Sequence, residues 1–223
     1  MTIKLFIQAI AKFLLGVVLV GLFVFWPAGT LQYFQGWLFM SILFIPMFIA
    51  GIVMMFKNPD LLKKRLKAKE KEAEQDKVVK LSGLMFLLGF IAAGLNYRFD
   101  WYVLPHSVSV IAGIVFLIAY ALYAEVLREN TFLSRTIEVQ ENQTVVDTGL
   151  YGIVRHPMYA VTLLLFLSMP LVLGSLISFV IFLTYPFLIA KRIKNEEALL
   201  EKELVGYKEY KTKVRYRLIP FIW

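Results

Sequence analysis

The stretch that decides the fold is "MYAVTLLLFLSMPLVLGSLISFVIFLTYPFLIA", residues 158–190, an apolar run interrupted near its centre. Pro170 cannot continue a regular helix and Gly174 permits a tight turn, so together they divide the run into two pieces of roughly 15 residues. At about 1.5 Å per residue, each piece reaches roughly 22 Å, which is less than the roughly 30 Å hydrocarbon core of a bilayer. We therefore predict a tight helical hairpin that barely reaches the far surface, with a bend at Pro186 near its end.

Four longer apolar segments precede this hairpin. The chain has 223 residues and is 59% hydrophobic, with a mean hydropathy of +0.69, which is too apolar for an ordinary soluble domain. Each segment approaches the ~20 residues that a spanning helix needs, and no cleavage pattern of small residues follows the first one. We predict an all-α integral membrane protein with four spanning helices before the hairpin: Leu5–Trp26, Trp37–Phe56 (kinked at Pro46), Val78–Leu95 and Ser107–Leu127.

The distribution of basic residues predicts the orientation. Four regions on one side hold 23 of the 24 Lys and Arg residues, and the opposite loops hold only Arg98. By the positive-inside rule, both termini are cytoplasmic. A single span over residues 158–190 would instead place the basic tail outside, so the distribution also favours the hairpin. The four regions are residues 1–12, 57–80, 128–157 and 191–223.

Two parts with different roles are predicted. Residues 1–127 supply the N-terminal transmembrane helices, with a charged loop over residues 57–80 that we expect to be a helical connector at the membrane surface. Residues 128–223 supply a loop, the hairpin and a tail, residues 191–223, that has the spacing of an amphipathic surface helix. Within the loop, "RTIEVQENQTVVDTG", residues 135–149, alternates as a short β-hairpin would.

The composition excludes several classes of function. The chain has no cysteine and two histidines that lie far apart, His106 and His156, so we expect no metal site. It lacks the glycine-rich signatures of Rossmann and P-loop nucleotide sites. The predicted spans carry almost no ionisable groups, which argues against a proton-coupled transporter or a channel. In so apolar a chain, the net charge of +8 indicates basic membrane loops and no nucleic-acid partner.

The hairpin begins at "RHPMY", residues 155–159, where ionisable residues gather. Pro157 suits the first turn of a helix, which leaves His156 at the helix entrance beside exposed backbone N–H groups that attract anions. Arg155 adds a fixed charge that can clamp a carboxylate. The plainer interpretation is that Arg155 extends toward the membrane surface and His156 only caps the helix.

The tail holds a second group of candidates. Glu197 falls on an apolar helical stripe, where a carboxylate needs a partner or a function. Glu196 follows Arg192 by four residues and can pair with it, while Tyr207 and Tyr210 lie one turn apart. The plainer interpretation is an interfacial helix whose basic residues contact lipid headgroups. Because a hairpin returns the tail to the face that holds "RHPMY", the two groups together suit a zwitterionic ligand with a flat ring.

These motifs carry a resemblance to a known family. "VVDTGLYGIVRHPMY" and "EEALLEKELVGYKEYKTKVRYRLIP", separated by an apolar hairpin, resemble the isoprenylcysteine carboxyl methyltransferase family, within a wider group that includes membrane phospholipid N-methyltransferases. The resemblance covers about residues 128–223. "LQYFQGW" and "NPDLLKKR" in the N-terminal half resemble bacterial members, which implies a bacterial cytoplasmic membrane.

The resemblance implies an S-adenosylmethionine-dependent methyltransferase whose cofactor pocket is cytosolic and whose lipophilic or lipidated substrate arrives from the bilayer. Arg155 would hold the pocket together or contact a carboxylate, Arg215 would orient the substrate carboxylate, and Glu197 would join them as a catalytic residue. Val161 stands where family members often have glycine, which predicts a narrower pocket or shifted helix packing. The residues implied to bind the cofactor are His156, Tyr159, Glu196, Glu197, Tyr207 and Tyr210.

Three functions remain open from the sequence. The favoured hypothesis is methylation of the carboxylate of an isoprenylcysteine-like molecule, which is already ionised and needs no general base. The second is a phospholipid or amine N-methyltransferase, in which Glu196, Glu197 or His156 would accept the proton of the amine. The third is a non-catalytic lipid-binding or scaffold protein of the same fold. The sequence predicts contacts with membrane lipids and sets no oligomeric state.

Overall fold

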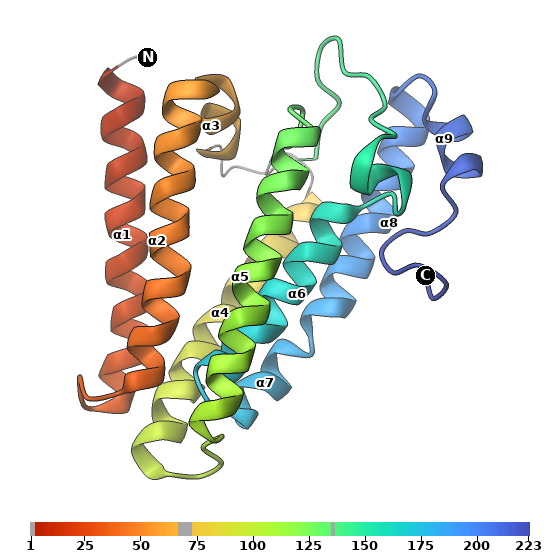
Figure 1. Cartoon of the computed structure of the whole chain (residues 1–223). Helices are drawn as coiled ribbons and strands as arrows, with labels where there is room; N and C mark the ends of the chain where they lie inside the picture. The colour runs from red at the N-terminus through yellow and green to blue at the C-terminus, as the bar shows by residue number, and fades with distance from the viewer. Residues whose placement is uncertain (1–2, 67–72, 135–136) are drawn as a thin grey trace.

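The computed structural model describes residues 3–66, 73–134 and 137–223. Every regular element in these residues is helical, and β-type pairing among them is limited to an isolated bridge between Val103 and Ser175. The predicted all-α class is thus confirmed. Within the described ranges, five helical stretches are long and apolar enough to cross a membrane (Figure 1). They are α1 (Ile3–Ala28), α2 (Phe34–Lys57), α4 (Ala73–Phe99), α5 (His106–Glu129) and the combined stretch Leu176–Glu203.

The hairpin forms where the apolar run predicted it, with a different second arm. The first arm is α6 (Pro157–Val172), and the second is α7 (Leu176–Phe182) followed by α8 (Tyr185–Glu203). Pro170 remains inside α6, and the turn comes at Gly174, whose φ of +69° favours glycine. Pro186 stands in the first turn of α8, just after a short interruption at residues 183–184.

The prediction of a separate tail helix beginning at residue 191 needs correction. The second arm continues without a break through residue 190 to Glu203, and only α9 (Tyr207–Lys213) is a separate, short helix. The reason is packing: Ile189, Ile193 and Glu197 recur every four residues and are all buried. Tertiary contacts on this stripe therefore extend the helix beyond the apolar segment.

The predicted β-hairpin is wrong for the described residues 137–149, and Arg135 and Thr136 lie outside the described residues. A turn forms instead, in which the amide of Gln143 donates to the carbonyl oxygen of Gln140 at 3.1 Å. Val139 and Val145 pack on a small tail cluster around Leu204 and do not pair across a strand ladder. The segment then ends in the one-turn 3₁₀ helix η1 (Gly149–Gly152) before α6.

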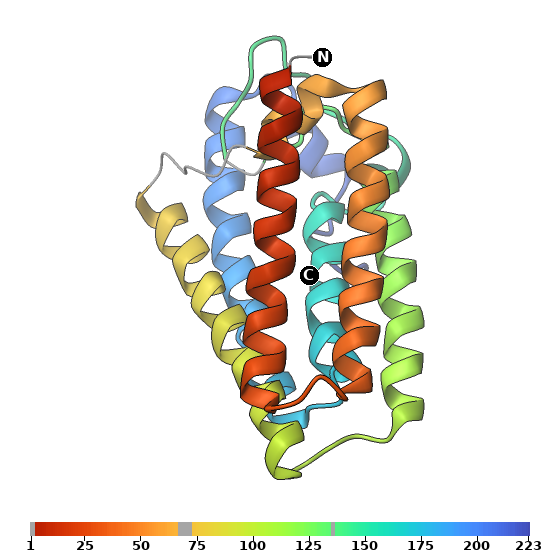
Figure 2. The same ribbon diagram turned by 90° about the vertical axis from the view of Figure 1, so that its left-hand side faces the viewer.

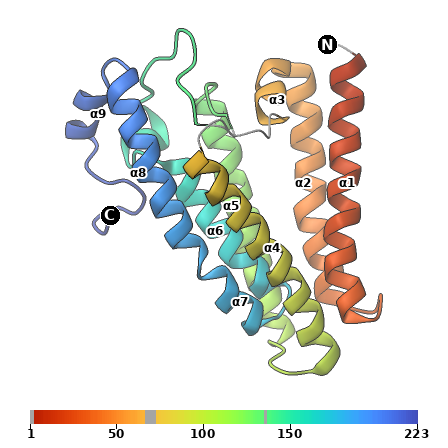
Figure 3. The ribbon, with the colours of Figure 1, turned by 180° about the vertical axis from the view of Figure 1, so that it is seen from behind.

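The bundle places α6 in the middle of the C-terminal half. α6 packs along α5, α1 packs along α4, and α4 also contacts α7 and α8. Figure 2 shows α1 and α2 at the front with α6 between and behind them. Figure 3, seen from behind relative to Figure 1, shows α4 beside α8. A Cβ on Gly89 would lie 2.3 Å from the ring of Phe182, so this glycine allows α7 to approach α4 closely.

The charged connector is helical where it is described. It forms α3 (Pro59–Leu66), in which Leu61 and Leu62 are buried while Lys63 and Lys64 follow them. Lys64 donates to the carbonyl oxygen of Thr131 at 3.3 Å, so α3 contacts the loop that follows α5. Residues 67–72 of the connector lie outside the described residues.

The hairpin turn has its backbone groups satisfied inside the protein. The hydroxyl of Tyr33 donates to the carbonyl oxygen of Leu173, and the amide of Leu104 donates to that of Gly174 at 2.8 Å. Unsatisfied backbone groups are costly at membrane depth. These donors, from the starts of α2 and α5, explain how a hairpin with arms of unequal length is held in place.

We expect Tyr33→Phe to lower the free energy of unfolding by about 1–2 kcal/mol, because it leaves a buried carbonyl without its donor. Denaturant unfolding in detergent micelles measures the change. Tyr102→Phe is the control, because Tyr102 is 66% exposed and loses only a hydroxyl at the surface. Equal stability of Tyr33→Phe and the wild type would show that the hydrogen bond does not hold the turn.

Candidate active site

The start of α6 is fixed by the C-terminal segment. The amide of Arg155 donates to the carbonyl oxygen of Tyr216 at 2.9 Å, and the amide of His156 donates to that of Arg217 at 2.9 Å. Pro157 occupies the first helical turn, as expected from the sequence. This pairing joins two segments about 60 residues apart and sets the direction of the Arg155 and His156 side chains.

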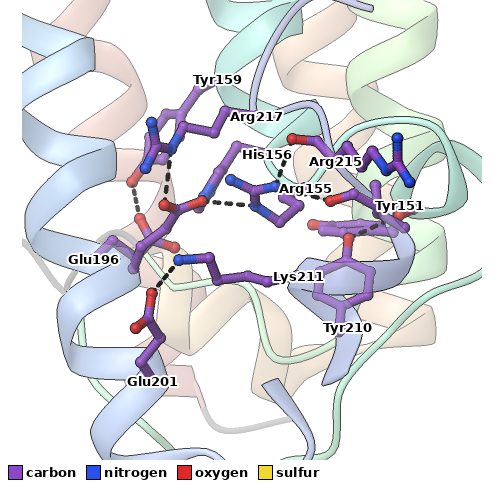
Figure 4. Close-up of polar contacts among 12 residues, drawn as sticks. Tyr151, Arg155, His156, Tyr159, Glu196, Glu201, Tyr210, Lys211, Arg215 and Arg217 are labelled. Carbon is purple, nitrogen blue, oxygen red and sulfur yellow. Dashed lines mark hydrogen bonds and ion pairs between the residues drawn. The ribbon is translucent and has the colours of Figure 1, made fainter. Parts of the chain in front are cut away.

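Glu197 is the centre of a buried charge cluster, whose members Arg155, His156 and Arg217 are labelled in Figure 4. Its carboxylate accepts hydrogen bonds from Arg155 Nε at 2.7 Å and from Arg217 Nε at 2.8 Å, and His156 Nε2 lies 3.3 Å away. Arg155 also donates to the carbonyl oxygens of Val214 and Arg215, each at 2.8 Å. Glu197 is only 2% exposed. Its negative charge is stable at this buried position because these donors replace the hydrogen bonds of water.

Glu196 points to a different neighbour. The hydroxyl of Tyr159 donates to Glu196 Oε2 at 2.5 Å, and Arg192 Nε donates to the same hydroxyl at 3.1 Å. Arg192 Nη1 also donates a hydrogen bond to Oε1 of Gln75, at the start of α4, at 3.3 Å. The acidic pair is therefore divided: Glu197 holds the buried cluster, and Glu196 faces the neighbouring cavity.

That cavity is a polar pocket beneath the loop between α5 and α6. Its volume is about 100 Å³, smaller than the roughly 300–1,000 Å³ of typical small-molecule sites, so a cofactor-sized ligand requires its walls to move apart. The loop contributes one wall, while the start of α6, α8 and α9 contribute the others. The lining residues with polar or aromatic side chains include Tyr151, Arg155, His156, Tyr159, Glu196, Tyr207 and Tyr210.

Two tyrosines of α9 form the aromatic wall. The ring centroids of Tyr207 and Tyr210 are 5.8 Å apart, and Tyr210 donates its hydroxyl to the carbonyl oxygen of Tyr151 at 2.7 Å. Burial, and then the nearby carboxylate of Glu197, raises the pKa of Tyr207, and burial raises the pKa of Tyr210. Both hydroxyls are therefore neutral at physiological pH and can donate hydrogen bonds.

The hydroxyl of Tyr207 is buried and has no hydrogen-bond partner among the described residues. Tyr207 is 4% exposed, and an unsatisfied buried hydroxyl costs about 1–3 kcal/mol. It lines the pocket, so a polar ligand there would supply the missing partner.

The tail also holds the loop in place. Lys213 at the end of α9 forms an ion pair with Asp147 at 2.6 Å. The hydrogen bond from Lys213 lowers the pKa of Asp147. Because the pair is exposed, it sets the position of the loop relative to α9 but contributes little to the free energy of unfolding.

Arg215 lies outside the cluster. Its side chain is exposed and extends away from Arg217 (Figure 4). It contributes its carbonyl oxygen, which accepts a hydrogen bond from Arg155. Arg217, two residues later, contacts Glu197 instead. The role expected for Arg215, orienting a substrate carboxylate, stays a prediction. Both arginines belong to the segment "VRYR", residues 214–217. The sequence does not show which of their side chains points toward Glu197, because that depends on the path of the backbone. Sequence reasoning also passed over Gln75 and Tyr151.

Val161 does not narrow the polar pocket. Two residues along a helix turn a side chain by about 200°, so Val161 faces away from Tyr159. It is buried, and it lines a separate apolar cavity of about 190 Å³ beside α5. The expected narrowing is therefore not seen at this pocket, and the alternative, shifted helix packing, stays a prediction.

The comparison with known families adds to this geometry. Residues 108–202 match the model of the isoprenylcysteine carboxyl methyltransferase (ICMT) family. This is the family that the sequence resembles. The matched segment runs from α5 to the end of α8 and contains Arg155, His156 and both glutamates, whereas α9 and Arg217 lie beyond it. The match covers less than half of the chain, so it shows a segment shared with this family. The five apolar helices among the described residues support an integral membrane protein.

A second similarity is partial. The chain is 31% identical over 91 residues to Delta(14)-sterol reductase TM7SF2 of Mus musculus, which is 40% of this chain and 22% of that protein. The chain thus spans about a fifth of the length of this curated relative. The similarity relates a part of the two chains and does not transfer the activity of the reductase to this one.

Proposed function

We propose that the protein transfers a methyl group from S-adenosylmethionine to a lipophilic acceptor in the membrane, with the carboxylate of an isoprenylcysteine-like molecule as the favoured acceptor. The observation that carries the proposal is the contact between the buried Glu197 cluster and a polar, aromatic-walled pocket. Both ICMT-like motifs meet there. By the charge distribution, we place this end of the bundle and both termini on the cytoplasmic side.

The residues of the pocket fit the cofactor chemically. Glu196 is a carboxylate at the pocket wall, which suits the ammonium group of the cofactor. His156 lies at the N-terminus of α6, which suits a carboxylate. Tyr207 and Tyr210 offer ring faces for a purine, and the Tyr207 hydroxyl has no hydrogen-bond partner in the described part of the chain. When bound, the cofactor supplies an electrophilic methyl group on a sulfonium.

An apolar groove supports a lipophilic acceptor. It has a volume of about 680 Å³ and lies between α5, α6 and the C-terminal segment. Its lining is almost entirely apolar and includes Ala160, Leu164 and Leu218. Leu218, which lines the groove, directly follows Arg217. We therefore propose that a hydrocarbon chain in the groove presents its polar head to the Arg217 guanidinium.

The charges favour an anionic acceptor over an amine. Two guanidinium groups, those of Arg155 and Arg217, share the single carboxylate of Glu197, so the cluster retains positive charge. Arg217 is the more accessible of the two, at 30% exposure against 5% for Arg155. A carboxylate is already ionised, so the chain's part in the reaction is to align the reactants and to exclude water.

A transfer assay tests the proposal. Purified protein in detergent is incubated with methyl-labelled S-adenosylmethionine and, separately, with prenylcysteine, an aminolipid or no acceptor. Base-labile label on prenylcysteine alone is the expected result. Label on the aminolipid would instead favour the amine reaction, in which Glu196 would take the proton. Absence of transfer to either, from folded protein that binds the cofactor, would favour the non-catalytic alternative.

We expect Arg217→Ala to raise the KM for the prenylcysteine acceptor about fivefold or more, because the accessible cation beside the groove is lost. Arg215→Ala is the matched control: it removes the same charge from an exposed side chain two residues away. It should change the KM less than twofold. An equal rise in both variants would show that the basic tail acts only through its overall charge.

A further inference from the structure

The last residues of the chain form a closed loop. The amides of Arg217, Leu218 and Ile219 all donate to the main-chain oxygen of Trp223, at 2.9, 2.9 and 3.2 Å, and the Trp223 amide donates back to Ile219 at 3.1 Å. Phe221 within the loop has a φ of +65°, which is strained for a bulky residue. Strain of this kind persists only where the surroundings hold the backbone.

The same tryptophan contacts the side chain of Arg217. The guanidinium carbon of Arg217 lies 5.3 Å from the centroid of the Trp223 ring, which is within cation–π range. The ring itself is partly buried against the hydrophobic core. Arg217 donates to Glu197 with its Nε at the same time. The guanidinium is therefore held between an aromatic face and a carboxylate.

The loop lies between the polar cluster and the apolar groove. The carbonyl oxygens of Tyr216 and Arg217 accept from Arg155 and His156 on one side. On the other side, Leu218 and Pro220 line the groove. A shift of this loop would move Arg217 relative to both.

We propose that Trp223 is the positioning residue for Arg217: its ring and its main-chain oxygen fix the Arg217 guanidinium against Glu197, one residue before Leu218, which lines the apolar groove. This rests on the proposed function insofar as Arg217 orients the acceptor. Trp223 does not line the polar pocket as described, so its effect is on the acceptor and not on the cofactor.

The test compares Trp223→Leu with Trp223→Phe. Leucine keeps an apolar side chain and the main-chain oxygen that accepts the three amides, but it removes the ring whose contact with Arg217 holds this hydrogen-bonded latch closed. Phenylalanine keeps an aromatic face for the cation. We expect Trp223→Leu to raise the acceptor KM at least fivefold with the Kd for S-adenosylmethionine changed less than twofold, and Trp223→Phe to restore most of the KM. Wild-type KM in Trp223→Leu, or a parallel loss of cofactor affinity and thermal stability, would overturn the proposal.

A second measurement does not depend on activity. Amide hydrogen exchange in the intact wild-type protein should be slow at residues 217–219, and it should accelerate in Trp223→Leu but not in Trp223→Phe. Fast exchange in the wild type would show that the hydrogen bonds from residues 217–219 to Trp223 do not hold the loop closed, and it would overturn the proposal even if methyl transfer is observed. Slow exchange that responds to the ring, in a protein that transfers no methyl group, would support the latch and reject the proposed function.

Discussion

Replacing Glu197 by alanine is expected to lower the free energy of unfolding by about 3–5 kcal/mol, because Arg155 would remain buried with its charge uncompensated. Arg155 is buried, so solvent has little access to its guanidinium and cannot readily replace the carboxylate. Arg217 and His156 would lose the same partner. We also expect the affinity for S-adenosylmethionine to fall at least tenfold, about 1.4 kcal/mol, since Arg155 and His156 line the pocket.

Two further variants separate folding from binding. Glu197→Gln keeps the shape of the side chain and removes only its charge, so it should remain folded at low temperature and still bind the cofactor at least tenfold more weakly. Glu201 lies on α8 like Glu197 and forms a more exposed ion pair with Lys211 of α9. Glu201→Ala should lower the free energy of unfolding by no more than about 1 kcal/mol. Unchanged cofactor affinity in Glu197→Gln, and likewise in His156→Ala, would refute the placement of the pocket.

The second large effect is expected for Tyr207→Phe. This variant should keep or gain thermal stability but lose affinity for S-adenosylmethionine. Without ligand, the variant loses a buried hydroxyl that has no partner among the described residues, so thermal stability should stay equal or rise. With ligand, the variant lacks a donor that we assign to the cofactor, so the affinity should fall about tenfold.

Tyr210→Phe is the matched control for that experiment. Its hydroxyl donates to the carbonyl oxygen of Tyr151, so its removal should lower the stability by about 1 kcal/mol. Calorimetric titration and thermal unfolding in the same detergent measure both quantities. A loss of stability in Tyr207→Phe with unchanged cofactor affinity would show that this hydroxyl has a structural partner and no ligand.

The parts of the fold that were predictable depend on local chemistry. Gly174 and the distribution of basic residues predicted the hairpin, because a turn and a charge balance are visible in the sequence alone. Pro157 predicted the start of α6 for the same reason. The continuation of α8 was not predictable in this way, since it depends on the burial of Ile193 and Glu197 against other helices.

The site shows the same division. "RHPMY" and the two glutamates pointed to neighbouring walls of one site. The choice of Arg217 over Arg215 depends on the direction of an irregular segment, for which the sequence has no periodic signal. The contact between Arg192 and Gln75 joins residues 117 positions apart, and no motif connects them. The loop over residues 137–149 alternates like a strand but packs on the tail instead.

The central claim is that the pocket between the loop, α6, α8 and α9 binds S-adenosylmethionine. Calorimetric titration of the folded, detergent-solubilised wild-type protein with S-adenosylmethionine tests it most directly. We predict a single site with a micromolar Kd. A folded sample that gives no binding heat at cofactor concentrations up to the millimolar range, at two temperatures, would contradict the claim.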